Sequence, residues 1–364
     1  MTRTVTIASG KGGVGKTNLA VNLAIALSRA GRKTCLFDAD LGLANVDILL
    51  GLAPRCTLKD VVMNGASVRE VMVRDVEGVD ILPGCSGVEE MADLDPGGMD
   101  HLIRSLSELS EYGFLIFDTS AGISRHVTSF CLASSETVLV VTPEPTSLTD
   151  AYALLKTLSL KGFKGRVRVV INQCGSASLA EAAFKKLKSA ASKYLAVAIS
   201  PLGVIRKDPK VSQAVKSQKS VLSLYPDGLY SRAVRRIGDR LLDEAGEPLG
   251  RQDMTSFWRS WLGFISGDES IASVPAGKDA KSGHEVNQLS SGSVERLVED
   301  VSSISRELRL IRRALEANGK GISLPVTPPS GLREWNPAPI QLDIEGFMRG
   351  RCLEEKDPSD GKQG

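Results

Sequence analysis

The sequence predicts an α/β fold in which helices flank a mostly parallel β-sheet. From Arg3 to about Glu247, short apolar or β-branched segments alternate with segments of helical periodicity, which is the pattern of repeated strand–helix–strand units. A glycine-rich segment with lysine and threonine separates the first apolar segment from the first helical one. Two later apolar segments end in aspartate. Together these features indicate a phosphate-binding site at the carboxyl ends of the strands.

The predicted elements alternate along the first two thirds of the chain. Strands are expected at residues 4–8, 33–38, 79–83, 114–118, 137–142, 166–172 and 196–199. Helices are expected at residues 18–30, 99–112, 147–161, 179–193 and 229–245. Because a single α/β domain reaches about 250 residues, we expect one such domain at 1–247, followed by further segments up to residue 364.

The glycine-rich segment has the spacing of a P-loop, so the predicted fold is that of a P-loop NTPase. In such a loop the glycines leave backbone N–H groups free to surround phosphate oxygens, and the next helix presents its positive end. Lys16 would pair with the β and γ phosphates, and the Thr17 hydroxyl would bind Mg²⁺. The alternative is a glycine-rich turn without a ligand. The predicted nucleotide-binding residues are Gly10, Lys11, Gly12, Gly13, Val14, Gly15, Lys16, Thr17 and Asn18.

Carboxylates follow two of the predicted strands. Asp38 and Asp40 come at the end of strand 33–38, and Asp118 closes strand 114–118. In open α/β sheets ligands bind at the carboxyl ends of parallel strands, so these side chains are expected to face the phosphates. Asp118 fits a Walker-B carboxylate, and Gly122 then lies in the segment that would sense the γ-phosphate. The alternative for Asp38 and Asp40 is that they only cap the next helix.

A second lysine, Lys11, makes the phosphate-binding segment read KGGVGKT from Lys11 to Thr17. This resembles the deviant P-loop, KGGxGKT, of the MinD/ParA ATPases, and the resemblance extends from residue 4 to about 245. It implies ATP and Mg²⁺ as cofactors. It also implies that Lys11 crosses a dimer interface to the partner's nucleotide, so that ATP joins two copies into a homodimer.

Four motifs are similar to those of one branch of this family, FlhG (YlxH). They begin at Gly15, Asp38, Asp118 and Thr142, and they read GKTN, DADLGLANVD, DTSAGIS and TPEPTSLTDAYA. The last motif is the most characteristic of the branch. The segment from Pro201 to Asp208 resembles the family's GxIPxD segment beside the base, with Arg206 standing where proline is usual.

The resemblance implies roles for the site residues. Asp38 and Asp118, together with Thr17, would hold the Mg²⁺ shell, and Asp40 would orient the water that attacks the γ-phosphate. Lys11, Lys16 and Asp40 form the implied catalytic set. The N–H of Gly122 would meet the γ-phosphate, and the amide of Asn172 would read the adenine edge.

The implied function is that of an ATP-dependent dimerising switch. A member of the FlhG branch is expected to hydrolyse ATP slowly, to need Mg²⁺ and dimerisation for this, and to regulate flagellar number or placement. The expected partners are an FlhF-like GTPase and flagellar basal-body or regulatory proteins, although no DQA-like motif precedes the first strand. MinD-type septum-site positioning and ParA-type partition of DNA or cargo remain alternatives.

Composition excludes several other classes. The 45 Lys+Arg against 43 Asp+Glu give a net charge of +2, so no global field attracts nucleic acid, and the basic residues at 185–193 and 232–240 also fit ordinary solvated helix faces. Specific nucleic-acid binding is therefore not expected. The six cysteines form no C-x-x-C pair, which argues against a zinc ribbon, a disulfide framework or an iron–sulfur carrier. The cytoplasm is the expected location, since no signal peptide and no long apolar segment occur.

The alternation of strands and helices stops after the first domain. Residues 251–266 have an apolar helical face with two tryptophans, and such a helix of about 20 Å is too short to span a bilayer. This pattern predicts an amphipathic membrane-targeting helix that attaches reversibly to the inner face of the cell membrane through residues 254–265. The alternative is that Phe257, Trp258 and Trp261 pack on the protein's own surface or on a partner.

The remaining segments are predicted from composition and periodicity. Residues 267–292 are rich in glycine, serine and aspartate and are expected to form a flexible linker. Residues 293–318 have apolar positions at heptad spacing, which predicts a helix that pairs with itself or a partner, or folds back on the ATPase domain. Residues 319–364 are proline-rich and are expected to stay disordered.

Overall fold

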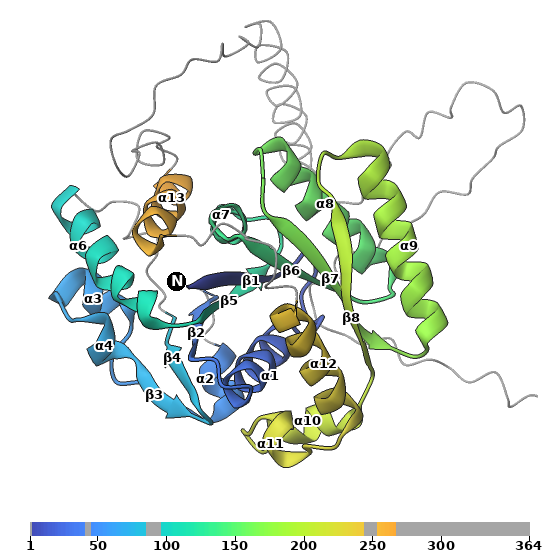
Figure 1. The fold of residues 1–364 in the computed structure, drawn as a ribbon, viewed down its shortest axis with the longest axis horizontal. Coiled ribbons are helices and arrows are strands. Elements are labelled where there is room, and N and C mark those ends of the chain that lie inside the picture. The colour runs from blue at the N-terminus through green and yellow to red at the C-terminus, as the bar shows by residue number, and fades with distance from the viewer. Residues whose placement is uncertain (1, 41–44, 85–95, 244–252, 267–364) are drawn as a thin grey trace, which may run out of the picture. The chain divides into compact units, whose positions relative to one another are not determined.

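The computed structural model describes residues 2–40, 45–84, 96–243 and 253–266. Within these ranges, eight strands form one sheet in the order β3-β4-β2-β5-β1-β6-β7-β8 (Figure 1). The strands are β1 (Arg3–Ser9), β2 (Thr34–Ala39), β3 (Val73–Val76), β4 (Val79–Leu82), β5 (Phe114–Ala121), β6 (Glu136–Val141), β7 (Arg166–Cys174) and β8 (Ile199–Arg206). All neighbours pair in parallel except β3 and β4, which form an antiparallel hairpin. The predicted mostly parallel α/β sheet is confirmed.

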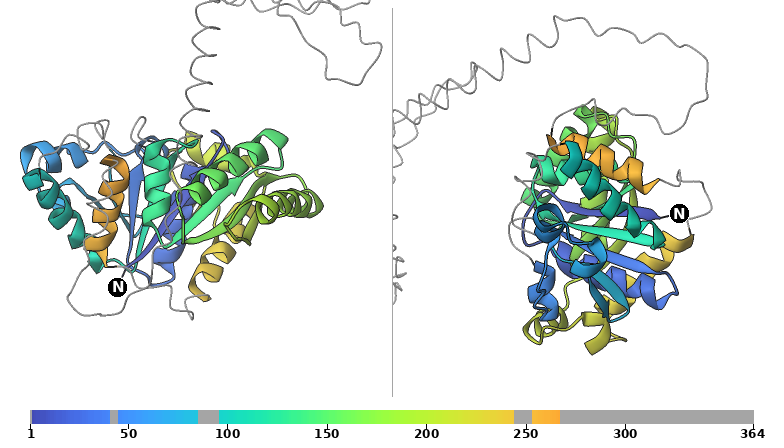
Figure 2. Two further views of the ribbon diagram at one scale, coloured as in Figure 1. Left: turned by 90° about the horizontal axis from the view of Figure 1, so that it is seen from above. Right: turned by 90° about the vertical axis from the view of Figure 1, so that its left-hand side faces the viewer.

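Helices cover both faces of the sheet, as Figures 1 and 2 show. One face carries α1 (Lys16–Arg29), α2 (Asn45–Leu50), α10 (Pro209–Lys216), α11 (Val221–Leu224) and α12 (Leu229–Asp243). The other carries α3 (Leu58–Asn64), α4 (Val68–Val71), α6 (Pro96–Ser107), α7 (Arg125–Ala133), α8 (Pro145–Leu160), α9 (Ala177–Tyr194) and α13 (Met254–Ser266). A 3-10 turn, η1 (Glu108–Glu111), follows α6. Strand side chains alternate between the two cores, so Leu36 packs under α1 while Phe37 packs on the opposite face.

The structure differs from the predicted elements where the sequence signals are short. The last strand begins at Ile199 and runs to Arg206, so the predicted strand at 196–199 was misplaced. Pro201 and Gly203 lie inside β8, and both residue types weaken a strand signal. The hairpin strand β3 and the helices α2, α3, α4, α7, α10 and α11 were not predicted. Most of them span one or two turns, too short for a helical period to emerge.

Helix α13 forms where it was predicted, but its apolar face is not free. Met254, Phe257, Trp258, Trp261 and Leu262 are each at most 2% exposed, and they belong to the same core as the sheet residues of β2 and β5. In this structure the face therefore packs on the protein's own core, which is the alternative given above, and membrane targeting by this helix stays a prediction. The apolar stripe that suggested a membrane surface instead covers aromatic side chains of the sheet. Figure 1 shows α13 between α6 and α7.

Polar contacts hold both ends of α13. The Asp253 carboxylate accepts hydrogen bonds from the backbone N–H and hydroxyl of Ser256, both at 3.0 Å. The Arg125 guanidinium donates to the carbonyl of Ile265 at 3.1 Å. The helix lies in the same compact unit as the sheet, Met1–Lys278, so it belongs to the α/β fold rather than to a separate segment. No helix in the described ranges is long and apolar enough to cross a membrane.

Three predicted segments lie outside the described residues. They are the linker at 267–292, the heptad-patterned helix at 293–318 and the proline-rich tail at 319–364. The same holds for the end of the predicted domain, residues 244–247.

Candidate nucleotide-binding site

Strand order brings the predicted site residues to one edge of the sheet. Strand β1, which leads into the glycine-rich loop, lies between β5 and β6, and β2 lies beside β5. In the parallel register Asp38 of β2 stands opposite Asp118 of β5, and Asp118 is also the partner of Ile7 in β1. Because parallel strands end at the same edge, both carboxylates lie next to the loop that follows β1.

The glycine-rich loop has the shape of an anion cradle. Gly13 and Gly15 adopt positive φ angles of 75° and 91°, which residues with a side chain rarely accept. A Cβ on Gly12 or Gly13 would meet no atom within 4 Å, so the loop faces open space. No side chain caps the N-terminus of α1, whose first N–H groups have no partner within the helix. A glycine-rich loop that leads into free N–H groups at the start of a helix is suited to bind a phosphate group.

Gly10 is needed for a different reason from the one predicted. A Cβ at this position would lie 2.2 Å from the carbonyl carbon of Asp150, so it would collide with the backbone of α8. Gly10 thus lets the start of the loop pack directly against that helix.

Buried charges mark the centre of the site. Asp118 is fully buried, and burial raises its pKa from 3.8 to about 7, with the Asp38 carboxylate as the next cause. Lys16 is 9% exposed, and its burial lowers its pKa although Asp118 and Asp40 act against this. Among the described residues neither oxygen of Asp118 accepts a hydrogen bond of normal geometry, although the Thr17 hydroxyl is near enough to oppose the rise in pKa.

These residues fit a bound Mg²⁺. Mg²⁺ is usually held by one or two carboxylates together with phosphate oxygens and water, so it needs few protein ligands. The unsatisfied carboxylate of Asp118 and the hydroxyl of Thr17 supply such ligands. No group of three or more His, Cys, Asp or Glu side chains that would hold a metal by themselves occurs in the part of the chain that is described.

Asp38 and Asp40 have different partners. The Asp38 carboxylate accepts hydrogen bonds from the backbone N–H of Asp40 at 3.2 Å and of Val46 at 3.3 Å. It therefore joins Asp40 to the start of α2, and its burial raises its pKa to about 7. Asp40 lines the cleft, and its carboxylate accepts a hydrogen bond from the side-chain amide of Asn45 at 2.9 Å. Asn45, five residues after Asp40, was not among the predicted site residues.

Lys11 is held within its own chain. Its ammonium group donates to the Glu144 carboxylate at 2.7 Å and to the Thr146 hydroxyl at 2.9 Å, at the start of α8. Glu144 and Thr146 belong to the motif TPEPTSLTDAYA, whose contact with the phosphate loop could not be seen from the sequence. Gly122, predicted to meet the γ-phosphate, has a φ of 106° and donates its N–H to the carbonyl of Ser9 at 2.9 Å.

Asn172 contacts the phosphate loop. Its side-chain amide donates to the carbonyl of Val14 at 2.7 Å, and its side-chain oxygen accepts the N–H of Gln173 at 2.8 Å. Gln173 has a φ of 56° and donates its own amide to the carbonyl of Gly13 at 3.0 Å. The predicted role of Asn172 at the adenine edge remains untested, but in this structure both of its polar atoms are engaged by the protein.

A cleft of about 900 Å³ runs from the phosphate loop toward the ends of β7 and β8. Its phosphate end is lined by Lys16, Thr17, Asp40 and Asn45, together with glycines of the loop. Asn172, Gln173, the segment 206–209 and apolar side chains of α2 and α10 line the rest of the cleft. A cleft of this size and polarity accommodates a nucleotide.

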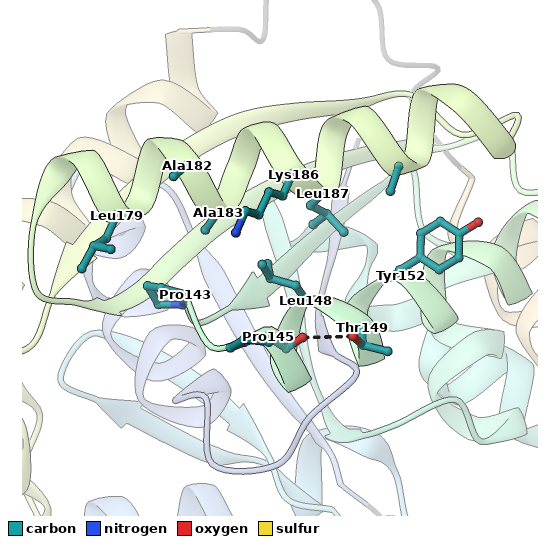
Figure 3. A pocket seen from close by; sticks show the side chains of 11 residues that line it. Pro143, Pro145, Leu148, Thr149, Tyr152, Leu179, Ala182, Ala183, Lys186 and Leu187 are labelled. Atoms are coloured by element: carbon teal, nitrogen blue, oxygen red, sulfur yellow. Dashed lines mark hydrogen bonds between the residues drawn. The ribbon is translucent and has the colours of Figure 1, made fainter. Parts of the chain in front are cut away.

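A smaller apolar groove lies between α8 and α9 (Figure 3). Its volume is about 410 Å³, and Leu148, Tyr152 and Leu187 line it, with Lys186 as its charged residue. The predicted catalytic carboxylates do not line this groove, so the nucleotide chemistry belongs to the larger cleft.

Comparisons with known proteins agree with this geometry. Residues 5–221 match the model of the CobQ/CobB/MinD/ParA nucleotide binding domain. The chain is 42% identical over 238 residues to the antiactivator FleN of Pseudomonas aeruginosa, covering 65% of this chain and 85% of FleN. It is 29% identical over 269 residues to the flagellum site-determining protein YlxH of Helicobacter pylori, covering 72% of this chain and 91% of YlxH.

Among solved structures, the septum site-determining protein MinD of Pyrococcus horikoshii OT3, in complex with Mg-ADP, is similar to this chain. The TM-score is 0.56 at 29% identity, and the match covers 68% of this chain and 98% of that one. The chain thus belongs to the MinD/ParA family within the CobQ/CobB/MinD/ParA nucleotide-binding domain, in the FlhG (YlxH) branch.

Proposed function

We propose that this protein is a Mg²⁺-dependent ATPase that switches between a monomer and an ATP-joined homodimer and that regulates flagellar number or placement. The observation that carries the proposal is the cleft itself, which a deviant P-loop, Lys16 and Asp40 line, with the buried Asp118 carboxylate acting on Lys16 from beneath. The flagellar assignment is supported by the likeness to FleN, an antiactivator, and to YlxH, a flagellum site-determining protein.

The residues of the cleft divide the work of phosphoryl transfer, which consists mostly of positioning and charge stabilisation. The loop N–H groups and Lys16 hold the phosphates. Thr17 and Asp118 would hold a Mg²⁺ ion, which would supply positive charge to the phosphate oxygens. Asp40, kept in place by Asn45, orients the attacking water, and Asp38 fixes the loop that carries Asp40.

Dimerisation requires Lys11 to change its partners. In the described conformation Lys11 pairs with Glu144 of its own chain, and this pair is largely exposed, so it contributes at most about 1 kcal/mol. A partner's phosphates carry more charge than one carboxylate and are able to displace it. We infer that nucleotide binding by two copies moves Lys11 from Glu144 to the nucleotide across the interface.

Membrane association is not needed for this proposal. For residues 254–265 to enter a lipid surface, α13 would have to leave the core, and each large apolar side chain so exposed costs about 1.5–3 kcal/mol. Liposome flotation with and without Mg-ATP measures whether nucleotide overcomes this cost.

The proposal is tested by hydrolysis and by mass in solution. Asp40→Ala should bind ATP, lose at least about a hundredfold in hydrolysis rate and accumulate as a dimer, because only the water-orienting carboxylate is removed. Lys11→Ala should stay monomeric with ATP in size-exclusion chromatography. A dimer fraction that neither change affects would contradict the mechanism.

The cellular role is tested separately by deletion of the gene. The proposal expects a changed number or position of flagella, whereas misplaced septa would favour the MinD-type function and loss of DNA or cargo would favour the ParA-type function.

A further inference from the structure

We propose that Arg125 is a positioning residue that couples the segment around Gly122 to the last turn of α13. This inference rests on the proposed function as an ATPase and adds to it a control of the preference for ATP over ADP. The contact of Arg125 with Ile265 favours the arrangement in which the N–H of Gly122 is bound by the protein itself. It therefore acts against a contact of that N–H with a γ-phosphate.

The N–H of Gly122 already has a partner. It donates to the carbonyl of Ser9 at 2.9 Å, and Ser9 ends β1 at the entrance to the phosphate loop. An N–H group that points at this carbonyl does not point at a phosphate, so a γ-phosphate contact requires Gly122 to turn. The turn meets no steric obstacle, because a Cβ on Gly122 would have no atom within 4 Å and the residue already has a φ of 106°.

Gly122, Ile123 and Ser124 join β5 to α7, and such a turn is easiest between the first two. Ile123 is 53% exposed, so the core does not hold its side chain. Ser124 is fixed to the helix instead. Its hydroxyl accepts the N–H of Val127 at 3.4 Å, and its carbonyl accepts the hydroxyl of Thr128 at 3.1 Å. The chain from Ser124 onward therefore moves with α7 as one body.

Helix α13 fixes the position of α7, and Figure 1 shows the two helices side by side. Arg125 is the first residue of α7, and its guanidinium donates to the carbonyl of Ile265 at 3.1 Å. The last carbonyls of a helix have no partner within it and carry partial negative charge, which a guanidinium complements. Farther along the same pair of helices, the ring centroids of Phe130 and Trp261 lie 4.9 Å apart. A turn of Gly122 that displaces the start of α7 has to break the contact of Arg125.

This contact should oppose the binding of ATP and not that of ADP. A ligand shifts an equilibrium between two arrangements only by its difference in affinity for them. ATP carries the γ-phosphate that the turned N–H would meet, whereas ADP does not, so only ATP has to act against the contact. Because Arg125 is exposed and its hydrogen bond competes with water, we expect an effect of about fivefold, equivalent to about 1 kcal/mol.

Isothermal titration calorimetry of the full chain with Mg-ADP and with slowly hydrolysed Mg-ATPγS measures this preference, at a concentration where size-exclusion chromatography shows a monomer. Arg125→Ala should raise the affinity for ATPγS about fivefold and change that for ADP less than twofold. Arg125→Lys keeps a positive donor at the end of α13, so it should reverse most of the change. Arg259→Ala is the matched control and should act less than twofold on both nucleotides. It removes a guanidinium from α13 that no hydrogen bond or ion pair joins to α7 among the described residues.

Tryptophan fluorescence gives an independent measurement, because Trp261 packs on Phe130 of α7. The sequence has three tryptophans, so Trp335→Phe leaves only Trp258 and Trp261, both in α13. Binding of ATPγS to this variant should change the emission, and binding of ADP should not. Adding Arg125→Ala should at least halve the change, because the start of α7 then turns without the end of α13.

The proposal is overturned if Arg125→Ala leaves the ratio of ATPγS affinity to ADP affinity unchanged or lowers it, or if Arg259→Ala raises this ratio equally. Equal changes of emission with the two nucleotides would also overturn it. Failure of the unaltered protein to bind either nucleotide would instead refute the proposed function.

Discussion

Replacing Trp258 by alanine tests whether α13 belongs to the core or is available to bind a membrane. Its indole is fully buried and packs against Phe37, Phe117, Phe257 and Trp261, at ring-centroid distances from 4.8 to 6.0 Å. The apolar faces of these rings lose their neighbour when the indole is removed. The change therefore leaves a cavity at the centre of the core between α13 and the sheet.

The expected cost follows from burial and from one hydrogen bond. Truncating a buried tryptophan or phenylalanine to alanine costs about 3–5 kcal/mol. The indole N–H of Trp258 also donates to the carbonyl of Leu106 at 3.0 Å, and an unsatisfied buried carbonyl costs about 1–3 kcal/mol. Since domains are stable by about 5–15 kcal/mol, Trp258→Ala removes a large share of the stability. Trp258→Phe keeps most of the ring contact and should lose about 1–2 kcal/mol.

Urea unfolding followed by far-UV circular dichroism measures both variants in the absence of lipid. With a slope of about 3 kcal/mol per molar urea, a loss of 4 kcal/mol lowers the midpoint by more than about 1 M. Ser260→Ala, on the half-buried polar side of the same helix, is the matched control and should shift the midpoint little. If Trp258→Ala unfolds at the same urea concentration as the unaltered protein, α13 does not belong to the core and the reasoning is refuted.

Three further changes test the site. Gly10→Ala should destabilise the fold by about 1–3 kcal/mol in thermal unfolding, because its Cβ meets the backbone of α8. Gly12→Ala is the control and should not destabilise the fold, because the space around Gly12 is open. Equal effects of the two changes would contradict the packing argument. Without metal, the free energy of unfolding should fall as pH rises from about 4 to about 7, since the folded pKa of Asp118 exceeds its ordinary value. Asp118→Asn should flatten this pH dependence and raise the free energy of unfolding at pH 8 by about 1–3 kcal/mol. Urea titrations that show the same slope for both proteins would contradict this prediction. Glu144→Ala frees Lys11 and should strengthen the ATP-dependent dimer by less than about fivefold in analytical ultracentrifugation, and a weaker dimer would speak against the exchange of partners.

The sequence by itself determined the class of fold and the phosphate end of the site. Alternation of apolar and helical segments is a local property, so strands β1, β2 and β4 to β7 could be located within a few residues. The spacing of the glycines with Lys16 and Thr17 is likewise local, because loop geometry depends on neighbours in the chain. The short helices were not predicted because a turn or two leaves no period to detect, and strand β8 was misplaced because Pro201 and Gly203 weaken its signal.

Only the tertiary structure decided what each surface faces. An amphipathic stripe has the same pattern whether it meets lipid or a protein core, so the aromatic face of α13 could not be assigned until the sheet residues beneath it were placed. The partners of Lys11 and Asn172 were likewise invisible, since strand order brings β7 and α8 to the phosphate loop across more than a hundred residues. Side-chain periodicity records that a surface is buried, whereas what buries it depends on contacts between segments distant in the chain.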